Sequence, residues 1–283
     1  AWRLCAELQT YDLSQVRPET LAELYLQIEA SDARSGVTAE DAEDVLRNEL
    51  RLQETTRGSL FDPVCGTGTY ICVAVRLVRE SLEGEGVSPA DISSHILENV
   101  AGTDANPLAV VVARTSYLLA LGDLLPSLHG EATVPVYLAD GAHTPHEVED
   151  DNERRQYVLL VGEGKDVLRI PEALMTNPEG VDYLLPFMKR KYGRSILGVL
   201  RDETSLSGNR AWESFRQFLV TPATSRKPFA LDEADADVMM ETQRALVKLM
   251  LEGRDAPWFF IMRNELQAAY LKQRRFDVVV DSR

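Results

Sequence analysis

Three short apolar segments of this chain each end in an aspartate and are separated by segments with helical spacing of apolar residues. This alternation is typical of parallel strands joined by helices, and it predicts an α/β fold with a doubly wound, Rossmann-like sheet. Because the carboxyl ends of parallel strands meet at one edge, we expect the three aspartates to face the same crevice. They are Asp62, Asp104 and Asp140, at the ends of predicted strands 59–62, 99–104 and 135–139.

The remaining sequence divides around this core. Apolar residues 275–280 predict a fourth strand near the end of the chain, and residues 157–161 and 167–170 flank a turn and predict a β-hairpin. Apolar periodicity predicts helices over residues 18–29 and 38–52, with Thr38 and Asp41 forming a capping box. The expected organisation is an N-terminal helical segment (1–57), a core (58–145), a largely helical insertion with the hairpin (146–271) and the fourth core strand (272–283).

The acidic composition of this chain argues against its binding nucleic acid without help from other regions or subunits. It carries 45 acidic against 30 basic residues, a net charge of −15, whereas free-standing nucleic-acid binders are usually basic. Any binding to DNA would therefore depend on other regions or subunits. The cysteines Cys5, Cys65 and Cys72 have no metal-ligand spacing, and we expect no metal site. Three cysteines cannot all pair with one another, which favours a reducing, cytoplasmic setting. The sequence suggests neither a leader nor a membrane span, so we expect no membrane contact.

A glycine-rich turn follows the first predicted strand and precedes a helix. Gly66 and Gly68 would let a ligand approach the backbone closely. A dinucleotide-binding fingerprint would require a further glycine where Ile71 stands, which counts against a dehydrogenase, the alternative by fold alone. Asp104 is placed to accept the ribose hydroxyls of a nucleoside, and Asp140 to receive an adenine amino group. As single residues, these aspartates could equally be turn formers or helix caps.

These motifs resemble those of a known enzyme family. The sequence Phe-Asp-Pro-Val-Cys-Gly-Thr-Gly-Thr-Tyr at residues 61–70 looks like motif I of the amino-group DNA methyltransferases. Gly-Thr-Asp-Ala-Asn-Pro-Leu-Ala-Val at residues 102–110 is similar to their G-x-D-x-N-P-x-A-V block, and residues 136–140 resemble their third motif. Residues 258–264 and 276–280 resemble the approach to motif IV. The likeness is to bacterial N6-adenine methyltransferases of restriction and phage-defence systems, of the Type IIG, BREX and DISARM kinds.

The resemblance implies S-adenosylmethionine as cofactor and a flipped adenine as methyl acceptor, in marking host DNA for restriction or antiviral defence. Double-stranded DNA, engaged outside this chain, and proteins of a defence complex would be its partners. Asp62 would hold the cofactor's amino group, Asp104 its ribose and Asp140 its adenine, with Ala105 or Pro107 against a ring face. The full expected cofactor-binding set is Asp62, Pro63, Cys65, Gly66, Thr67, Gly68, Thr69, Asp104, Ala105, Asn106, Pro107 and Asp140.

The sequence departs from the family in two places. The catalytic Asn/Asp-Pro-Pro-aromatic motif is absent, since Val280 is followed by Asp281-Ser282-Arg283, so the catalytic residues stay unassigned. The Tyr-Thr-Pro stretch that often precedes motif I is also missing, and we interpret the chain as part of a longer protein. Two alternatives remain open. One is a non-catalytic scaffold with the methyltransferase fold in a defence complex, and the other is a related RNA or protein-glutamine methyltransferase.

Overall fold

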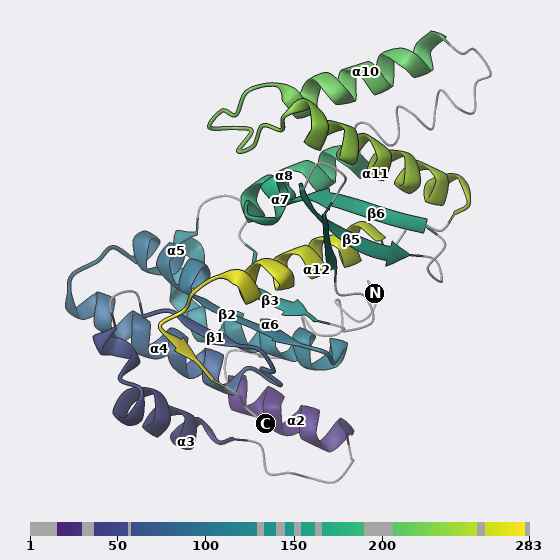
Figure 1. Cartoon of the computed structure of the whole chain (residues 1–283). Helices are drawn as coiled ribbons and strands as arrows, with labels where there is room; N and C mark the ends of the chain where they lie inside the picture. Colours follow the sequence, from purple (N-terminus) through teal and green to yellow (C-terminus); the bar gives the residue numbers. More distant parts are fainter. Residues whose placement is uncertain are drawn as a thin grey trace. The chain divides into compact units, whose positions relative to one another are not determined.

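The computed structural model describes residues 16–29, 37–55, 58–128, 133–139, 145–149, 154–161, 166–189, 206–253 and 258–280. They belong to two compact units, which are drawn in Figure 1. We call Ala1–Leu138 with Arg275–Arg283 the sheet unit, and Ala139–Arg274 the insertion unit.

A parallel sheet of four strands forms the centre of the sheet unit. Its spatial order is β3-β2-β1-β7, comprising Val136–Leu138, Val100–Asp104, Leu60–Asp62 and Val278–Val279. In register, Leu60 lies beside Val100 on one side and Val278 on the other. These strands confirm the four predicted from apolar segments, and the α/β class with a parallel sheet is compatible with a Rossmann-like fold. The chain runs outward from β1 to β3 and returns on the other side of β1, so the order reverses between β1 and β7.

Three helices pack with the sheet in this unit. Helix α4 (Thr69–Gly84) and helix α5 (Pro89–Asn99) connect β1 to β2, and α6 (Pro107–Leu121) leads from β2 toward β3. Sequence reasoning did not predict α5, although Ser88 caps it by accepting a hydrogen bond from the Asp91 N–H and Pro89 occupies its first turn. The fully buried side chains of this core include Leu60, Ile71, Val75, Ile96, Val100, Tyr117 and Leu121.

One stretch of the described residues, Pro107–Ser127, is long and apolar enough to cross a membrane by length and composition. It consists of α6 and the 3-10 helix η3 (Gly122–Ser127). Within it, Tyr117 is completely buried and its hydroxyl donates to the carbonyl oxygens of Ile96 and Val100. Part of the stretch packs in the core of the sheet unit, since 39% of its apolar window is buried, while Val111 and Leu118 are 59% and 40% exposed.

The N-terminal part of the sheet unit is helical but more broken than predicted. Helix α2 spans Pro18–Glu29, and α3 spans Ala39–Asp44 after a cap in which Thr38 Oγ1 accepts from the Asp41 N–H at 3.1 Å. The helix expected over residues 38–52 is confirmed only in part. A π-helical turn, η1 (Val45–Glu49), and a short 3-10 helix, η2 (Leu52–Glu54), follow α3 instead. Arg51 between them has a left-handed φ of 49°, which a continuous α-helix does not contain.

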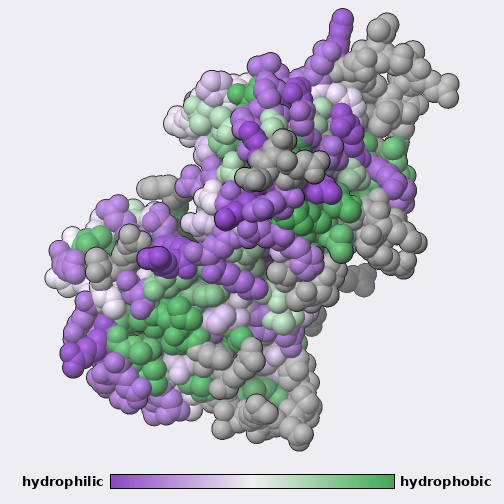
Figure 2. Space-filling view, viewed as in Figure 1, coloured by the Kyte–Doolittle hydropathy of each residue, from purple (hydrophilic) through white to green (hydrophobic). Residues whose placement is uncertain are grey.

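Strand β7 is fixed beside β1 by a pair of side chains that precede the two strands. The Asp277 carboxylate accepts from the N–H of Ser59 at 3.1 Å and from its hydroxyl at 2.9 Å, while the Asp277 N–H donates to that hydroxyl oxygen at 2.9 Å. Val279 of β7 is 60% exposed. Figure 2 shows a hydrophobic area on the face of the molecule that carries β7.

The insertion unit has a core of its own. An antiparallel sheet joins β4 (His146–Glu149), β5 (Arg155–Val161) and β6 (Asp166–Pro171), which confirms the predicted hairpin and adds the unpredicted β4. The edge of β6 is covered by α11, whose Thr242 hydroxyl accepts from the Arg169 N–H and donates to the Arg169 carbonyl. The described residues of this unit form the helices α7 (Glu172–Met175), α8 (Pro178–Pro186), α10 (Leu206–Val220), α11 (Glu233–Leu251) and α12 (Trp258–Gln273).

Phe259 of α12 lies in the core of the insertion unit with 6% of its surface exposed. This residue belongs to the stretch 258–264 that resembles the approach to motif IV in sequence. Burial of Phe259 supports packing as its role, because a base-stacking platform must be accessible.

Candidate functional site

The glycine-rich turn lies at the carboxyl end of β1 and leads directly into α4. The Gly68 N–H donates to the Cys65 carbonyl at 2.8 Å, which closes the turn. Gly66 and Gly68 have φ values of 53° and 86°, which favour glycine. A methyl group added at Gly66 would meet nothing within 4 Å, whereas one at Gly68 would lie 3.2 Å from Ala113 Cβ. Gly68 therefore allows helix packing, and Gly66 leaves open space beside the backbone.

Asp104 joins this turn to the loop that follows β2. Its Oδ2 accepts from the Gly66 N–H at 2.8 Å, and its Oδ1 accepts from the Asn106 N–H at 2.8 Å. Two further contacts hold the loops together. The Cys65 N–H donates to the Thr103 carbonyl at 2.8 Å, and the Thr103 hydroxyl donates to the Pro63 carbonyl at 2.8 Å. The two sequence motifs thus form one hydrogen-bonded structure.

Asp62 is completely buried at the end of β1. Its Oδ1 accepts from the Val64 N–H at 3.1 Å, in the geometry of an aspartate that shapes the following turn. Negative charge at this position also affects nearby side chains. Burial, followed by the charge of Asp62, raises the pKa of the Tyr70 hydroxyl on α4.

Cys65 is a packing residue within the turn. Its side chain is 3% exposed, and burial together with the charges of Asp62 and Asp104 raises the pKa of the thiol well above its ordinary value. A reactive cysteine requires the opposite shift, because the thiolate is the nucleophile. The side chain therefore contributes shape to the turn.

The first turn of α4 begins without a side-chain cap. Gly68 occupies the N-cap position, so no side-chain oxygen from that residue accepts the first main-chain N–H groups. No acidic residue lies in this first turn either. The N-terminus of a helix with these properties favours a bound anion or carboxylate.

Helix α2 reaches the loop after β2 through Tyr25. The Asn106 side-chain N–H donates to the Tyr25 hydroxyl at 3.0 Å, and α2 packs along α6 and α4. Sequence reasoning predicted the helix over residues 18–29 and did not connect Tyr25 with the site. The only signal in the sequence is the tyrosine itself, whose hydroxyl needs a partner when the ring packs against other residues.

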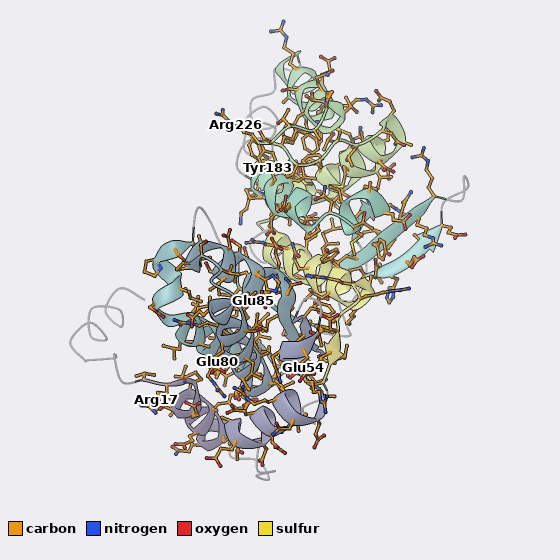
Figure 3. All side chains as sticks on the ribbon, turned by 90° about the vertical axis from the view of Figure 1, so that its left-hand side faces the viewer. Arg17, Glu54, Glu80, Glu85, Tyr183 and Arg226 are labelled. Atoms are coloured by element: carbon orange, nitrogen blue, oxygen red, sulfur yellow. The ribbon has the colours of Figure 1, made fainter. Side chains whose placement is uncertain are left out.

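A cavity of about 780 Å³ opens between α2, the start of α3 and α4. It borders the glycine turn at Thr67 and Thr69, and Arg17 and Glu80, labelled in Figure 3, are among its lining residues. Arg76 in its wall donates to Glu43 at 2.6 Å and to Glu80 at 3.2 Å. The size is that of a small-molecule pocket.

The structure brings most of the predicted site residues together. Asp62, the residues from Cys65 to Thr69, and those from Asp104 to Pro107 come from adjacent strand ends, and Ala105 and Pro107 are exposed there. Asp140 lies outside the described residues, so its predicted contact with adenine stays a prediction. Among the residues that are described, no group of three or more His, Cys, Asp or Glu side chains has a geometry that could hold a metal ion.

Comparison with known proteins gives little further identification. No protein family and no curated protein matches the sequence. A solved structure, the ATP-dependent Type ISP restriction-modification enzyme LlaBIII bound to DNA, matches with a TM-score of 0.33 and 15% identity. The match covers 48% of this chain and 10% of that one, so the chain spans a small part of the enzyme's length. A similarity at this level does not assign an activity.

Proposed function

We propose that this chain is the cofactor-binding part of an S-adenosylmethionine-dependent DNA adenine-N6 methyltransferase. The observation that carries the proposal is the hydrogen bond between Asp104 and Gly66, which unites the motif I turn with the acidic loop after β2. Both lie at the carboxyl edge of the parallel sheet, where α/β proteins of this topology bind nucleotides. The sequence motifs at these positions resemble those of the methyltransferase family.

The described residues fit the cofactor. Gly66 leaves open space beside the backbone, and the uncapped N-terminus of α4 offers N–H groups to the methionine carboxylate. A carboxylate has about four lone-pair sites, so Asp104 retains capacity for ribose hydroxyls beyond its main-chain contacts. Ala105 and Pro107 are exposed and would pack on a ring face. When bound, S-adenosylmethionine supplies an electrophilic methyl group.

The substrate side of the proposal depends on regions outside this chain. A net charge of −15 opposes binding to a polyanion, so segments or subunits with basic surfaces would hold the double-stranded DNA. The role we assign is the marking of host DNA in restriction or phage defence, possible partners being the proteins of such a complex. The residue that accepts hydrogen bonds from the target amino group stays unassigned.

A second candidate is a non-catalytic scaffold with the same fold. The observation that favours it is that both Asp104 oxygens already accept main-chain N–H groups, so the residue has a structural purpose without any ligand. Such a protein would keep the fold and present its acidic surface to a basic partner. A related methyltransferase acting on RNA or on protein glutamine would share the cofactor site and differ in its substrate region.

Isothermal titration tests whether the chain binds the cofactor, which distinguishes the methyltransferase proposal from the non-catalytic scaffold. The chain would be titrated with S-adenosylmethionine, with its demethylated product S-adenosylhomocysteine, and with NAD as a nucleotide control. The proposal predicts micromolar binding of the first two, roughly −8 kcal/mol, and no binding of NAD. A folded chain that binds none of them would contradict the proposal and favour the scaffold. Preference for NAD would contradict both.

A further inference from the structure

We infer that Tyr25 is a positioning residue of the site, acting through Asn106, an inference that rests on the proposed function. Tyr25 lies on α2, outside the sequence motifs, and its hydroxyl accepts from Asn106 Nδ2 at 3.0 Å. This bond spans 81 positions in the sequence. It connects the N-terminal helix to the loop that carries Asp104.

Asn106 contacts its surroundings through its main chain and through both ends of its side-chain amide. Its main-chain N–H donates to Asp104 Oδ1 at 2.8 Å. Its side-chain Oδ1 caps α6 by accepting from the Leu108 N–H at 2.9 Å, and its Nδ2 donates to Tyr25. An amide that is turned over would point Nδ2 at the Leu108 N–H, placing donor against donor. The Leu108 N–H therefore fixes the amide orientation, and in that orientation Nδ2 faces the Tyr25 hydroxyl, which accepts its hydrogen bond.

The same chain of hydrogen bonds continues to the glycine turn. The Asn106 side chain donates to Tyr25, and the Asn106 main-chain N–H donates to Asp104 Oδ1. Asp104 Oδ2 in turn accepts from the Gly66 N–H. A change at Tyr25 is thereby transmitted to the carboxylate that we propose binds ribose. Tyr25 itself acts on the cofactor through Asn106 and Asp104.

Two leucines of α2 contribute little to apolar packing. Leu24 and Leu26 are 51% and 45% exposed, so part of the helix's apolar surface faces away from the unit. Tyr25 is half-buried, and its hydrogen bond supplies a directional contact to α6. The seating of α2 and the geometry of the loop after β2 are therefore linked through this residue.

The test compares Tyr25→Phe with Tyr117→Phe as a matched control. Each variant loses a hydroxyl from the sheet unit, but Tyr117 donates to the carbonyls of Ile96 and Val100, outside the Asp104 loop. We expect Tyr25→Phe to weaken S-adenosylmethionine binding about three- to tenfold, the effect of one lost hydrogen bond. The main-chain amides of residues 104–106 and of Leu108 should also exchange faster without ligand. Tyr117→Phe should lower the melting temperature and leave both readouts unchanged.

A double-mutant cycle distinguishes positioning from a loss of stability. Asn106→Ser keeps a capping oxygen for α6 and removes the amide that donates to Tyr25. In the Asn106→Ser background, Tyr25→Phe should cause no further loss of affinity, since the pair acts through one bond.

The outcomes separate the two proposals. If the wild-type chain binds S-adenosylmethionine, and Tyr25→Phe binds it with the same affinity and shows the same amide exchange, this inference is overturned. The methyltransferase proposal would stay intact. Additive losses in the cycle would also overturn the inference. Absence of binding by the folded wild-type chain would overturn the proposed function, and with it any role for Tyr25 in a cofactor site.

Discussion

The carboxylate of Asp104 accepts a hydrogen bond from the main-chain N–H of Gly66 at 2.8 Å, across 38 positions in the sequence. The turn that opens α4 therefore takes part of its conformation from the strand next to it. This relationship explains why the two motifs belong together physically. Each supplies a partner for the other, and together they form the edge at which we propose that the cofactor binds.

Gly68 should be intolerant of a side chain. Its φ of 86° and a distance of 3.2 Å from an added methyl to Ala113 Cβ predict that Gly68→Ala lowers the free energy of unfolding by about 1–3 kcal/mol. Gly84→Ala is the matched control, because Gly84 lies at the end of α4 with nothing within 4 Å of its added methyl. That variant should be neutral or gain up to about 1 kcal/mol. Urea unfolding measures both, and equal effects would refute this explanation.

Asp277 should stabilise the return of the chain to the sheet. Its carboxylate accepts from the N–H and hydroxyl of Ser59, so Asp277→Ala removes both contacts at the start of β7. We expect a loss of about 1–3 kcal/mol in unfolding free energy. Asp123→Ala, which breaks an exposed ion pair with Arg79, should have a much smaller effect. If the two variants unfold at the same denaturant concentration, the Ser59 contact contributes no special stability.

Alkaline pH should destabilise the sheet unit through Cys72. Burial, then the charge of Glu19, raises the pKa of this thiol from its ordinary value of 9.0 to about 12. Between these values the unfolded state loses the proton and the folded state keeps it, so stability is intact below pH 9 and falls as the pH rises. The slope from this group is at most about 1.4 kcal/mol per pH unit. Cys72→Ala should flatten the stability curve above pH 9, and an unchanged slope would exclude the thiol as its cause.

Most strands and helices of this chain could be predicted because their patterns are local. The apolar run ending at Asp62 contains its own signal, and so does the N-cap at Thr38, whose hydroxyl accepts from the Asp41 N–H and donates to the Asp41 carboxylate. The break at Arg51 could not be predicted, because a left-handed residue there depends on how η1 and η2 pack. Strand β4 is similarly weak in sequence, since its mostly exposed residues lack an apolar pattern and pair with β5.

The candidate site could be predicted as a set of residues but not as a set of contacts. Sequence placed Asp62 and Asp104 at neighbouring strand ends, which the parallel pairing of β1 and β2 confirms. It could not show that Asp104 already holds the Gly66 N–H, nor that Tyr25 reaches Asn106. Such contacts arise from packing between distant segments, so the structural roles of Asp104 and Tyr25 are visible only in the folded chain.

The most direct test of the central claim is the affinity of S-adenosylmethionine for the wild-type chain and for Asp104→Asn. The asparagine has the same shape but removes the charge that faces the Gly66 N–H. Asp91→Asn, in the cap of α5, is the control for charge loss elsewhere in the sheet unit. We predict micromolar binding by the wild-type and control chains and at least about tenfold weaker binding by Asp104→Asn, a difference of about 1.4 kcal/mol. Equal affinity of a folded Asp104→Asn variant, or no binding by the folded wild-type chain, would contradict the claim.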